Sequence, residues 1–338
     1  MTVTGTPVEP ASAPLSAPRP RRRWWLAIRV SLSVGLVAAL MVWADLGQLW
    51  RVLGGVSVAG LAALLAMFSA ERVVAAYRWH LLLRAQGGEM GFAITFKATL
   101  LGGFLGGFLP GIVGHEAVRM LAMARATGRA AVAVSSVIFD RLIGTLALLA
   151  MVIVALAFVG PGQVARSVDA LAYGGAAATL LILAAMMHGR GRTWIADRAR
   201  ARPGSRLIRE LEAFADAGHA LAGRAGVLAQ VAAWAVIFQA LRVGIAPVAA
   251  WALGIDVPLV YCLIYVPIII LLMMLPVSIA GLGVREVGFV YFFGATLMSH
   301  EQALAIGLLI AVLTLLFQMP GAVVCITGVG TARPASPG

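Results

Sequence analysis

The sequence predicts an all-α, polytopic membrane protein with about six full spans and two oppositely oriented re-entrant helical hairpins in an inverted repeat. Of its 338 residues, 61% are hydrophobic and only 12% are charged, whereas about 25% of a soluble domain is charged. Six apolar runs are long enough to cross a bilayer, whose hydrocarbon core takes about 20 residues of helix. Two further apolar runs each end in Leu-Pro followed by a glycine-rich stretch.

The N-terminal residues 1–23 predict a disordered basic tail, because they are rich in Pro, Ala and Ser and end in Arg21-Arg22-Arg23. The apolar run that follows continues to about Ala44 without a small-residue cleavage site, so we expect a retained helix rather than a signal peptide. Trp24 and Trp25 are expected to anchor it at the interface. Residues 24–328 then form one transmembrane domain, and 329–338 a short C-terminal tail.

The predicted full spans are 26–45, 54–77, 130–159, 168–187, 227–252 and 302–326. Clusters of Lys and Arg mark the cytoplasmic flanks of membrane helices. They occur at the N-terminus, at 78–84, at 119–129 and in the loop 188–226. Both termini are therefore expected in the cytoplasm, with the chain in a bacterial-type cytoplasmic (inner) membrane.

The apolar run 92–109 has basic residues on both sides, so we expect it to enter from the cytoplasmic face and return. The long loop 188–226 is either a positively charged connection or carries amphipathic helices that lie on the anionic inner leaflet.

The two interrupted segments resemble each other. Leu109 to Arg119 reads LPGIVGHEAVR, and Leu275 to Glu286 reads LPVSIAGLGVRE, with an Arg nine residues after the Pro in both. The flanking spans repeat at a similar offset, which divides the domain into halves at about 46–160 and 220–328. Because an odd number of spans separates the copies, they have opposite orientations, as in many transporters. Two proline-kinked helices that cross the membrane are the alternative.

The formal net charge of +12 is explained by membrane topology and does not indicate nucleic-acid binding. Cys262 and Cys325 lie singly in apolar stretches, which indicates neither a disulfide framework nor a metal site. No cofactor is predicted.

Ten charged residues fall at membrane depth, where each costs at least about 2.5–3.5 kcal/mol on insertion scales. The cations are Arg72, Lys97, Arg119, Arg141, Arg242 and Arg285, and the acids are Glu71, Glu116, Asp140 and Glu286. Lys97 is close enough to an edge to extend its ammonium to the interface.

Asp140 and Arg141 lie about 15 Å into their span, at 1.5 Å per residue. Neighbours on a helix point about 100° apart, so each needs a partner from another segment. One interpretation is a set of ion pairs that fixes helix packing. The other is an anion site, since the excess of about two cations would bind a phosphate-bearing headgroup.

The glycines and prolines of the interrupted segments are candidate hinge positions: Pro110, Gly111, Gly114, Pro276, Gly281 and Gly283. Glycine at these places permits either close helix packing or exposed backbone amides that bind anions. Enzyme signatures such as HExxH, GxSxG, a Walker A loop or CxxC do not occur. His115-Glu116 is more typical of a loop cap than of acid–base catalysis, so no catalytic residue and no enzyme activity are predicted.

Four motifs together resemble the lysylphosphatidylglycerol synthase transmembrane-region family. They are Arg78-Trp79, the LPG-x-x-G-x-E-x-x-R segment ending at Arg119, Asp140-Arg141-Leu142 with Gly144, and the LP-x-S-x-x-G-x-G-x-RE segment ending at Glu286. The family contains the flippase domain of the multiple peptide resistance factor and stand-alone membrane proteins. The chain has no stretch for the soluble aminoacyltransferase domain of the synthases, so we do not expect it to make lysyl-lipid.

The resemblance implies a lipid transporter, and we expect a flippase for an anionic phospholipid, a glycolipid or a polyprenyl-phosphate carrier. Headgroup contacts are assigned to Arg78, Arg119, Arg141, Arg242 and Arg285, and coupling or ion-pair roles to Glu71, Glu116, Asp140 and Glu286. The expected partner is a membrane lipid with a phosphate headgroup. Alternative functions are an accessory subunit for a lipid-modifying enzyme or glycosyltransferase and an ion-coupled solute carrier. A second copy of the chain and a lipid-modifying enzyme are the candidate protein partners.

Overall fold

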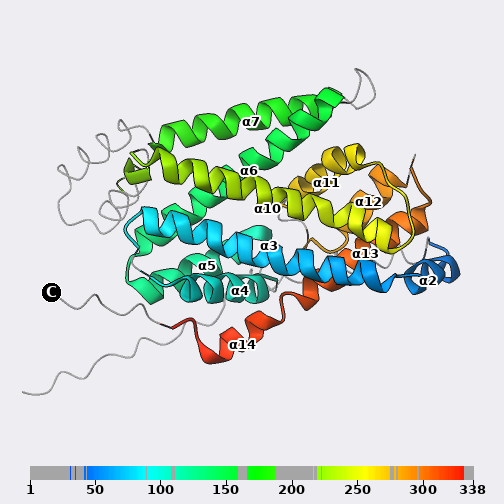
Figure 1. The fold of residues 1–338 in the computed structure, drawn as a ribbon, viewed down its shortest axis with the longest axis horizontal. Coiled ribbons are helices and arrows are strands. Elements are labelled where there is room, and N and C mark those ends of the chain that lie inside the picture. The colour runs from blue at the N-terminus through cyan, green and yellow to red at the C-terminus, as the bar shows by residue number, and fades with distance from the viewer. Residues whose placement is uncertain are drawn as a thin grey trace, which may run out of the picture.

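The computed structural model describes Ser31, Gly35, Val42 and residues 44–330, except for 89, 108–110, 159–165, 188–215, 217–218, 222, 275–277, 279–280 and 295–296. All of the regular elements among the described residues are helices (Figure 1). The predicted all-α class is therefore confirmed for this part of the chain.

Four described segments are long and apolar enough to cross a membrane, and each falls on a predicted span. They are α3 (Val58–Ala85), α6 (Ala130–Phe158), α10 (Ala225–Ala252) and the run His300–Thr327, which contains α13 (His300–Leu316) and α14 (Pro320–Thr327). These helices lie roughly along the long axis of the molecule (Figure 1).

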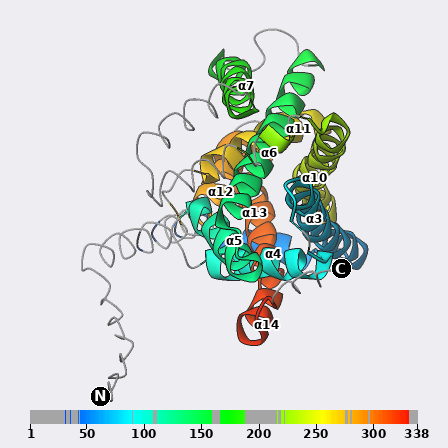
Figure 2. The ribbon, with the colours of Figure 1, turned by 90° about the vertical axis from the view of Figure 1, so that its left-hand side faces the viewer.

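The predicted spans 168–187 and 26–45 do not coincide with any of these four segments. Helix α7 (Arg166–Met187) covers the run 168–187, and within its described residues Ala172–Ala184 is an apolar helix. It packs against α6 at the outside of the bundle (Figures 1 and 2). The run 26–45 lies almost wholly outside the described residues, so the count of six full spans remains a prediction.

The predicted boundaries of span 54–77 are wrong at both ends. Residues Leu46–Gly54 form a separate short helix, α2. Helix α3 begins after Ser57, whose hydroxyl accepts a hydrogen bond from the Gly60 N–H at 3.1 Å. It then continues through Arg78 to Ala85. The expected end lies just before Arg78, but this arginine is buried inside the protein and does not mark a membrane surface.

The predicted span 302–326 is interrupted. Helix α13 ends at Leu316, and α14 begins at Pro320. Proline has no N–H to donate and its ring clashes with the preceding turn, which accounts for the break. Gly321 then fits against the Leu100 backbone, where a β-carbon would overlap it.

The first interrupted segment is a helical hairpin of α4 (Phe92–Gly107) and α5 (Gly111–Thr127). Gly106 lies against His115, and Gly102 lies against Arg119. A step of four residues back along α4 moves the contact four residues forward along α5. The two helices are therefore antiparallel, and successive turns of one pack on successive turns of the other.

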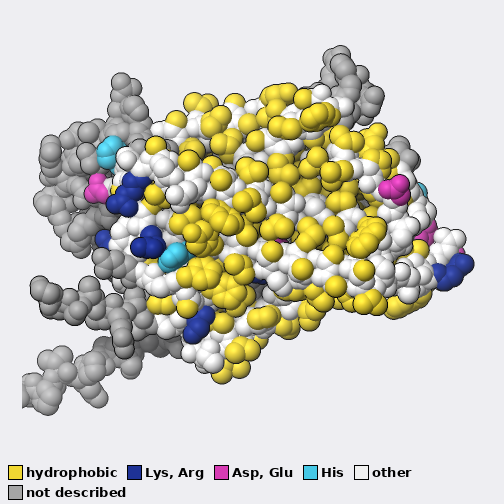
Figure 3. Space-filling model, viewed as in Figure 1, with side chains coloured by type: hydrophobic (Ala, Val, Ile, Leu, Met, Phe, Trp, Pro, Cys, Tyr) yellow, Lys and Arg dark blue, Asp and Glu magenta, His cyan; other side chains and the backbone are white. Residues whose placement is uncertain are grey.

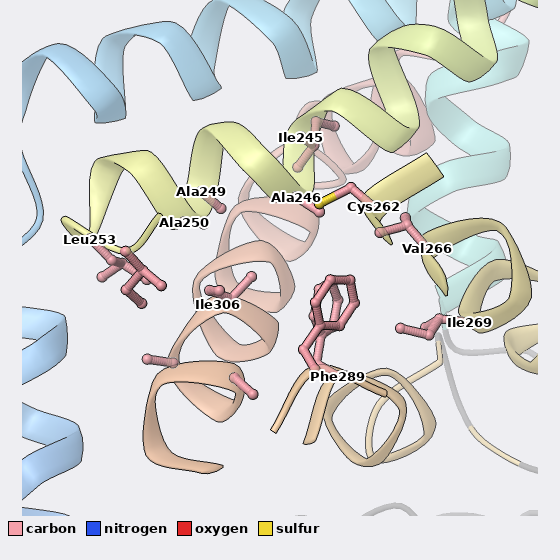
Figure 4. Packing of buried hydrophobic residues seen from close by; sticks show 14 of the residues in the cluster. Ile245, Ala246, Ala249, Ala250, Leu253, Cys262, Val266, Ile269, Phe289 and Ile306 are labelled. Atoms are coloured by element: carbon pink, nitrogen blue, oxygen red, sulfur yellow. The ribbon is translucent and has the colours of Figure 1, made fainter. Parts of the chain in front are cut away.

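The second interrupted segment has the same form, with α11 (Leu259–Met273) followed by α12 (Val284–Phe293). Gly288 lies against Ile269, and the rings of Tyr265 and Phe292 stack at 5.2 Å. Figure 4 shows how this hairpin contributes Ile269 and Phe289 to a buried apolar cluster with residues of α10 and α13.

Helices α3 and α10 pack side by side and antiparallel along their length (Figure 1). At one end Gly60 lies against Ala252, and at the other the rings of Tyr77 and Trp234 meet at 5.2 Å. This contact between α3 and α10 is the α3–α10 seam.

The remaining helix contacts occur in matched pairs. Helix α5 packs on α6 as α12 packs on α13, and α3 packs on α4 as α10 packs on α11. Across the halves, α4 packs on α14 and α11 packs on α6. The hairpins enter from opposite ends of the molecule (Figure 1). This arrangement is consistent with the predicted inverted repeat, and the re-entrant relation to a membrane remains a prediction.

The face of the bundle shown in Figure 3 is apolar in its middle and carries its charged side chains at the two ends. Exposed side chains such as Leu181, Ile182 and Val312 are 51–72% accessible, which is the surface that a lipid environment requires. The described exposed cations at the end where α3 stops are Arg84, Arg125, Arg129 and Arg224. The opposite end carries Asp45, Arg51 and Asp256.

Candidate functional site

A cavity of about 270 Å³ lies where the tips of the two hairpins meet, between the hairpins, α3, α6, α10 and α13. Its apolar wall includes Phe68, Leu148 and Ile269. The charged and titratable side chains that line it are Glu71, Arg72, Arg78, His115, Glu116, Arg119, Asp140, Arg141, Arg242 and Arg285. Residues from both halves therefore converge on one internal site.

Asp140 bridges two arginines from different elements. Its Oδ1 accepts a hydrogen bond from Arg78 Nε at 2.6 Å, and its Oδ2 lies 3.4 Å from Arg119 Nη2. All three residues are 4–5% exposed. The prediction that Asp140 needs a partner from another segment, with Arg119 available, is consistent with these contacts.

Arg119 makes two further contacts that fix its position on α5. Its Nη1 donates to Glu116 Oε2 at 3.0 Å, and its guanidinium lies 4.1 Å from the centre of the Trp79 ring. Trp79 is held in turn by a 2.9 Å hydrogen bond from its Nε1 to Ser136 Oγ. The Arg78–Asp140–Arg119–Glu116 network thus joins α3, α5 and α6.

Arg141 and Arg242 differ from these arginines, because neither forms an ion pair within 4.0 Å with any residue in the described part of the chain. They lie on α6 and α10 and both line the cavity. The two helices are tied nearby by a 2.7 Å hydrogen bond from Gln239 Nε2 to the Gly144 carbonyl. The Arg242 guanidinium lies 5.9 Å from the centre of the Phe238 ring.

Glu71 and Arg72 lie on adjacent positions of α3 and approach each other only to 3.8 Å. Arg72 Nε is buried without a hydrogen-bond partner among the described residues. This pair is looser than the network around Asp140, although both of its side chains reach the same cavity.

In the second hairpin, Arg285 lines the cavity and Glu286 does not. Glu286 Oε2 accepts a 2.6 Å hydrogen bond from the Gly283 N–H, so this carboxylate caps the start of α12. Gly281 and Gly283 have φ of +77° and +83°, a conformation that favours glycine.

The glycines of the first hairpin have two roles. Gly102 and Gly106 permit close contact with α5, while Gly103, Gly106 and Gly107 line the cavity. Gly111 and Gly114 lie in the first turn of α5. Pro110 and Pro276 lie outside the described residues. Close packing and an open glycine surface, predicted as alternatives, therefore occur together on α4.

The exposure of Lys97 is consistent with the expected extension of its ammonium to the interface, whereas the position of Arg78 needs correction. Lys97 is exposed on the outside of α4 and does not reach the cavity. Arg78 was placed in a cytoplasmic flank as well as among the headgroup contacts, yet it is buried in the ion-pair network. Lys97 leaves the set of internal cations and Arg78 joins it, so the set still has six members. With Glu286 counted among four internal acids, the predicted excess of two positive charges is unchanged.

The sequence analysis did not select Trp79, Phe238 or Gln318 as site residues, although all three contact or approach charged groups of the cavity. Gln318 could have been found, because it is a polar residue directly before Met319-Pro320-Gly321 in an apolar run. Phe238 carries no signal of this kind. Within the described ranges, no three His, Cys, Asp or Glu side chains are grouped as a metal site would require.

Comparison with known families matches residues 25–321 to the family described as Lysylphosphatidylglycerol synthase TM region. No curated protein and no solved structure matches the chain. The matched range includes the cavity and all the helices that line it. The chain is therefore a member of the lysylphosphatidylglycerol synthase TM region family, a family of multi-pass membrane domains.

Proposed function

We propose that this protein is a lipid transporter, a flippase whose internal cavity takes a phosphate-bearing headgroup while the acyl or prenyl tails stay in the bilayer. The observation that carries the proposal is the charge of the cavity. Six arginines and three carboxylates line it, between helices whose outer surfaces are apolar.

Uncompensated cations at this depth are costly, and those that persist usually face a cavity or a substrate pathway. Guanidinium groups suit phosphate because their fork of N–H donors binds two oxygens at once. The apolar wall beside the arginines suits the glycerol or first tail carbons of a lipid. A polar solute without a tail would leave that wall without a partner.

The arrangement of the helices supports transport rather than binding alone. The cavity lies between two hairpins that enter from opposite ends, and matched helices of the two halves surround it. Such sites at the interface of inverted halves can be exposed to either side by a movement of one half against the other. We propose that the end bearing Arg84, Arg125 and Arg129 faces the cytoplasm, because cytoplasmic flanks collect positive charge.

A translocation assay tests the proposal. Purified protein in liposomes should move lipids labelled on the headgroup between leaflets faster than empty liposomes do, with phosphate-bearing headgroups moved faster than uncharged ones. Asp140→Asn should abolish this movement while lipid binding persists.

Wild-type protein that is inactive across several headgroup classes would contradict the transporter and favour an accessory subunit of a lipid-modifying enzyme. Activity that appears only when such an enzyme is added would establish the role of an accessory subunit.

A further inference from the structure

We propose that the cavity selects a headgroup with two negative charges, a phosphomonoester or a diphosphate, and that Arg141 and Arg242 bind it. This inference rests on the proposed function, since it names the class of lipid that the same cavity would take.

The first group of arginines is already neutralised. Arg78 and Arg119 share Asp140 at 2.6 and 3.4 Å, and Arg119 also binds Glu116 at 3.0 Å. Trp79 covers the face of the Arg119 guanidinium at 4.1 Å. A headgroup that bound to Arg78 or Arg119 would have to displace carboxylates from short contacts. These two arginines therefore line the site without binding the headgroup.

The second group, Arg141 and Arg242, faces the same cavity without an ion pair to any described residue. The two side chains come from α6 and α10, which Gln239 and Gly144 connect at 2.7 Å. The positive charge of Arg141 acts unfavourably on that of Arg242. An anion between them would remove this repulsion and bridge the two helices.

Glu71 occupies the place of a competing anion. It is 7% exposed, its closest ion-pair contact is 3.8 Å to Arg72, and its charge acts on both Arg242 and Arg285. This carboxylate partly balances the charge of Arg242. A bound phosphate would take over that role, so Glu71 weakens the binding of an anion.

The balance of charge sets the number of negative charges on the headgroup. If Arg285 and its neighbour Glu286 are counted as balanced, five arginines and three carboxylates remain around the cavity, an excess of two positive charges. A phosphodiester headgroup carries one negative charge and would leave one cation uncompensated in a buried site. A phosphomonoester carries about −1.5 to −2 at pH 7, and a diphosphate at least as much, so both bring the site close to neutrality.

Binding in detergent at pH 8 tests this selection without any need for transport. The probes are phosphatidic acid, phosphatidylglycerol and phosphatidylcholine with identical acyl chains. We expect phosphatidic acid to bind at least tenfold more tightly than phosphatidylglycerol, and phosphatidylcholine to bind most weakly. Equal affinities for the first two would overturn the proposal, even if the protein proves to move lipids.

Three variants and one control locate the site. Arg141→Gln and Arg242→Gln should each reduce the preference for phosphatidic acid severalfold, and Glu71→Gln should increase affinity for it. Lys97→Gln, which removes a cation on the outer surface of α4, should change nothing. The proposed position is wrong if Lys97→Gln has the same effect as Arg242→Gln.

Soluble anions identify the source of the phosphate. Inorganic pyrophosphate should compete with phosphatidic acid, but at concentrations at least a hundredfold higher, because it leaves the apolar wall empty. Pyrophosphate that binds as tightly as the lipid would overturn the lipid headgroup as the ligand. A protein that binds phosphatidic acid selectively but moves no lipid between leaflets would instead contradict the transport function alone.

Discussion

Asp140 is the residue on which the electrostatics of the cavity depend most directly. Its two oxygens contact arginines of two different helices, and its own side chain is 4% exposed. Removal of one member of a buried pair is costly because the remaining charges stay buried without a partner. The neighbouring Arg141 has no such pair among the described residues, so adjacent positions should respond very differently to substitution.

Asp140→Asn is therefore expected to destabilise the protein by about 3–5 kcal/mol, whereas Arg141→Gln should cost less than about 1 kcal/mol. Reversible unfolding of both variants in the same detergent measures this difference. Equal losses would show that Arg141 is held by contacts as strong as those of Asp140.

The depth of a charged residue within an apolar run indicates whether its side chain lies inside the protein. Asp140, Arg141 and Arg242 lie well inside apolar runs, and all three line the cavity. This rule fails for Arg78, because a charge at the end of an apolar run normally marks a surface. Only the tertiary position of Asp140, 62 residues away along the chain, reveals that Arg78 is internal.

The helical hairpins carry the next level of organisation, and their close packing depends on glycine. A β-carbon on Gly106 would overlap the backbone of His115, whereas a β-carbon on Gly103 would lie 3.8 Å from its nearest neighbour. The two positions are three residues apart on the same helix, so helix propensity affects them alike.

Gly106→Ala should lower the free energy of unfolding by about 1–3 kcal/mol, as overpacking typically does. Gly103→Ala should leave it unchanged or raise it slightly, since alanine favours helix over glycine. Thermal unfolding of the two variants side by side provides the comparison. A destabilised Gly103→Ala would contradict the assignment of that face to open space.

The re-entrant geometry predicts which positions share a face of the membrane. In a background with Cys262→Ala and Cys325→Ser, cysteines at Arg84 and Ala130 should react with an impermeant reagent from one side. Cysteines at Asp256 and Ser299 should react from the other side. These four positions are exposed and flank the two hairpins.

Labelling of Arg84→Cys and Ala130→Cys from opposite sides would show that an odd number of crossings separates them. The first interrupted segment would then be a kinked crossing helix, which was the alternative in the sequence analysis. The hairpins were predictable because Leu-Pro and glycine interrupt two apolar runs. The break at Pro320 was missed, because it lies near the end of a run that otherwise has the length of one span.

At the scale of the whole molecule, the two halves match in helix contacts but differ in charge. The first half supplies the Asp140 network and Glu71, while the second supplies Arg242 and Arg285 to the cavity. The repeat could be predicted because backbone breaks recur in the sequence at the same spacing. The asymmetry of the site could not, since it depends on which side chains face inward from helices that contact across the α3–α10 seam.

The excess of two positive charges near the middle of the bundle has a consequence for the response to membrane voltage. Each elementary charge that crosses the full field is worth about 2.3 kcal/mol per 100 mV, so two charges are worth up to about 4.6 kcal/mol. When a dianionic headgroup is bound, the conformational change carries almost no net charge across the field. Without a headgroup, the same change carries two positive charges. We therefore expect a potassium diffusion potential across the liposome membrane to alter the rate of the conformational change without bound lipid. The rate of the change with bound lipid should stay the same. Measured rates that do not depend on the sign of this potential would show that the arginines stay fixed in the field while the lipid moves past them.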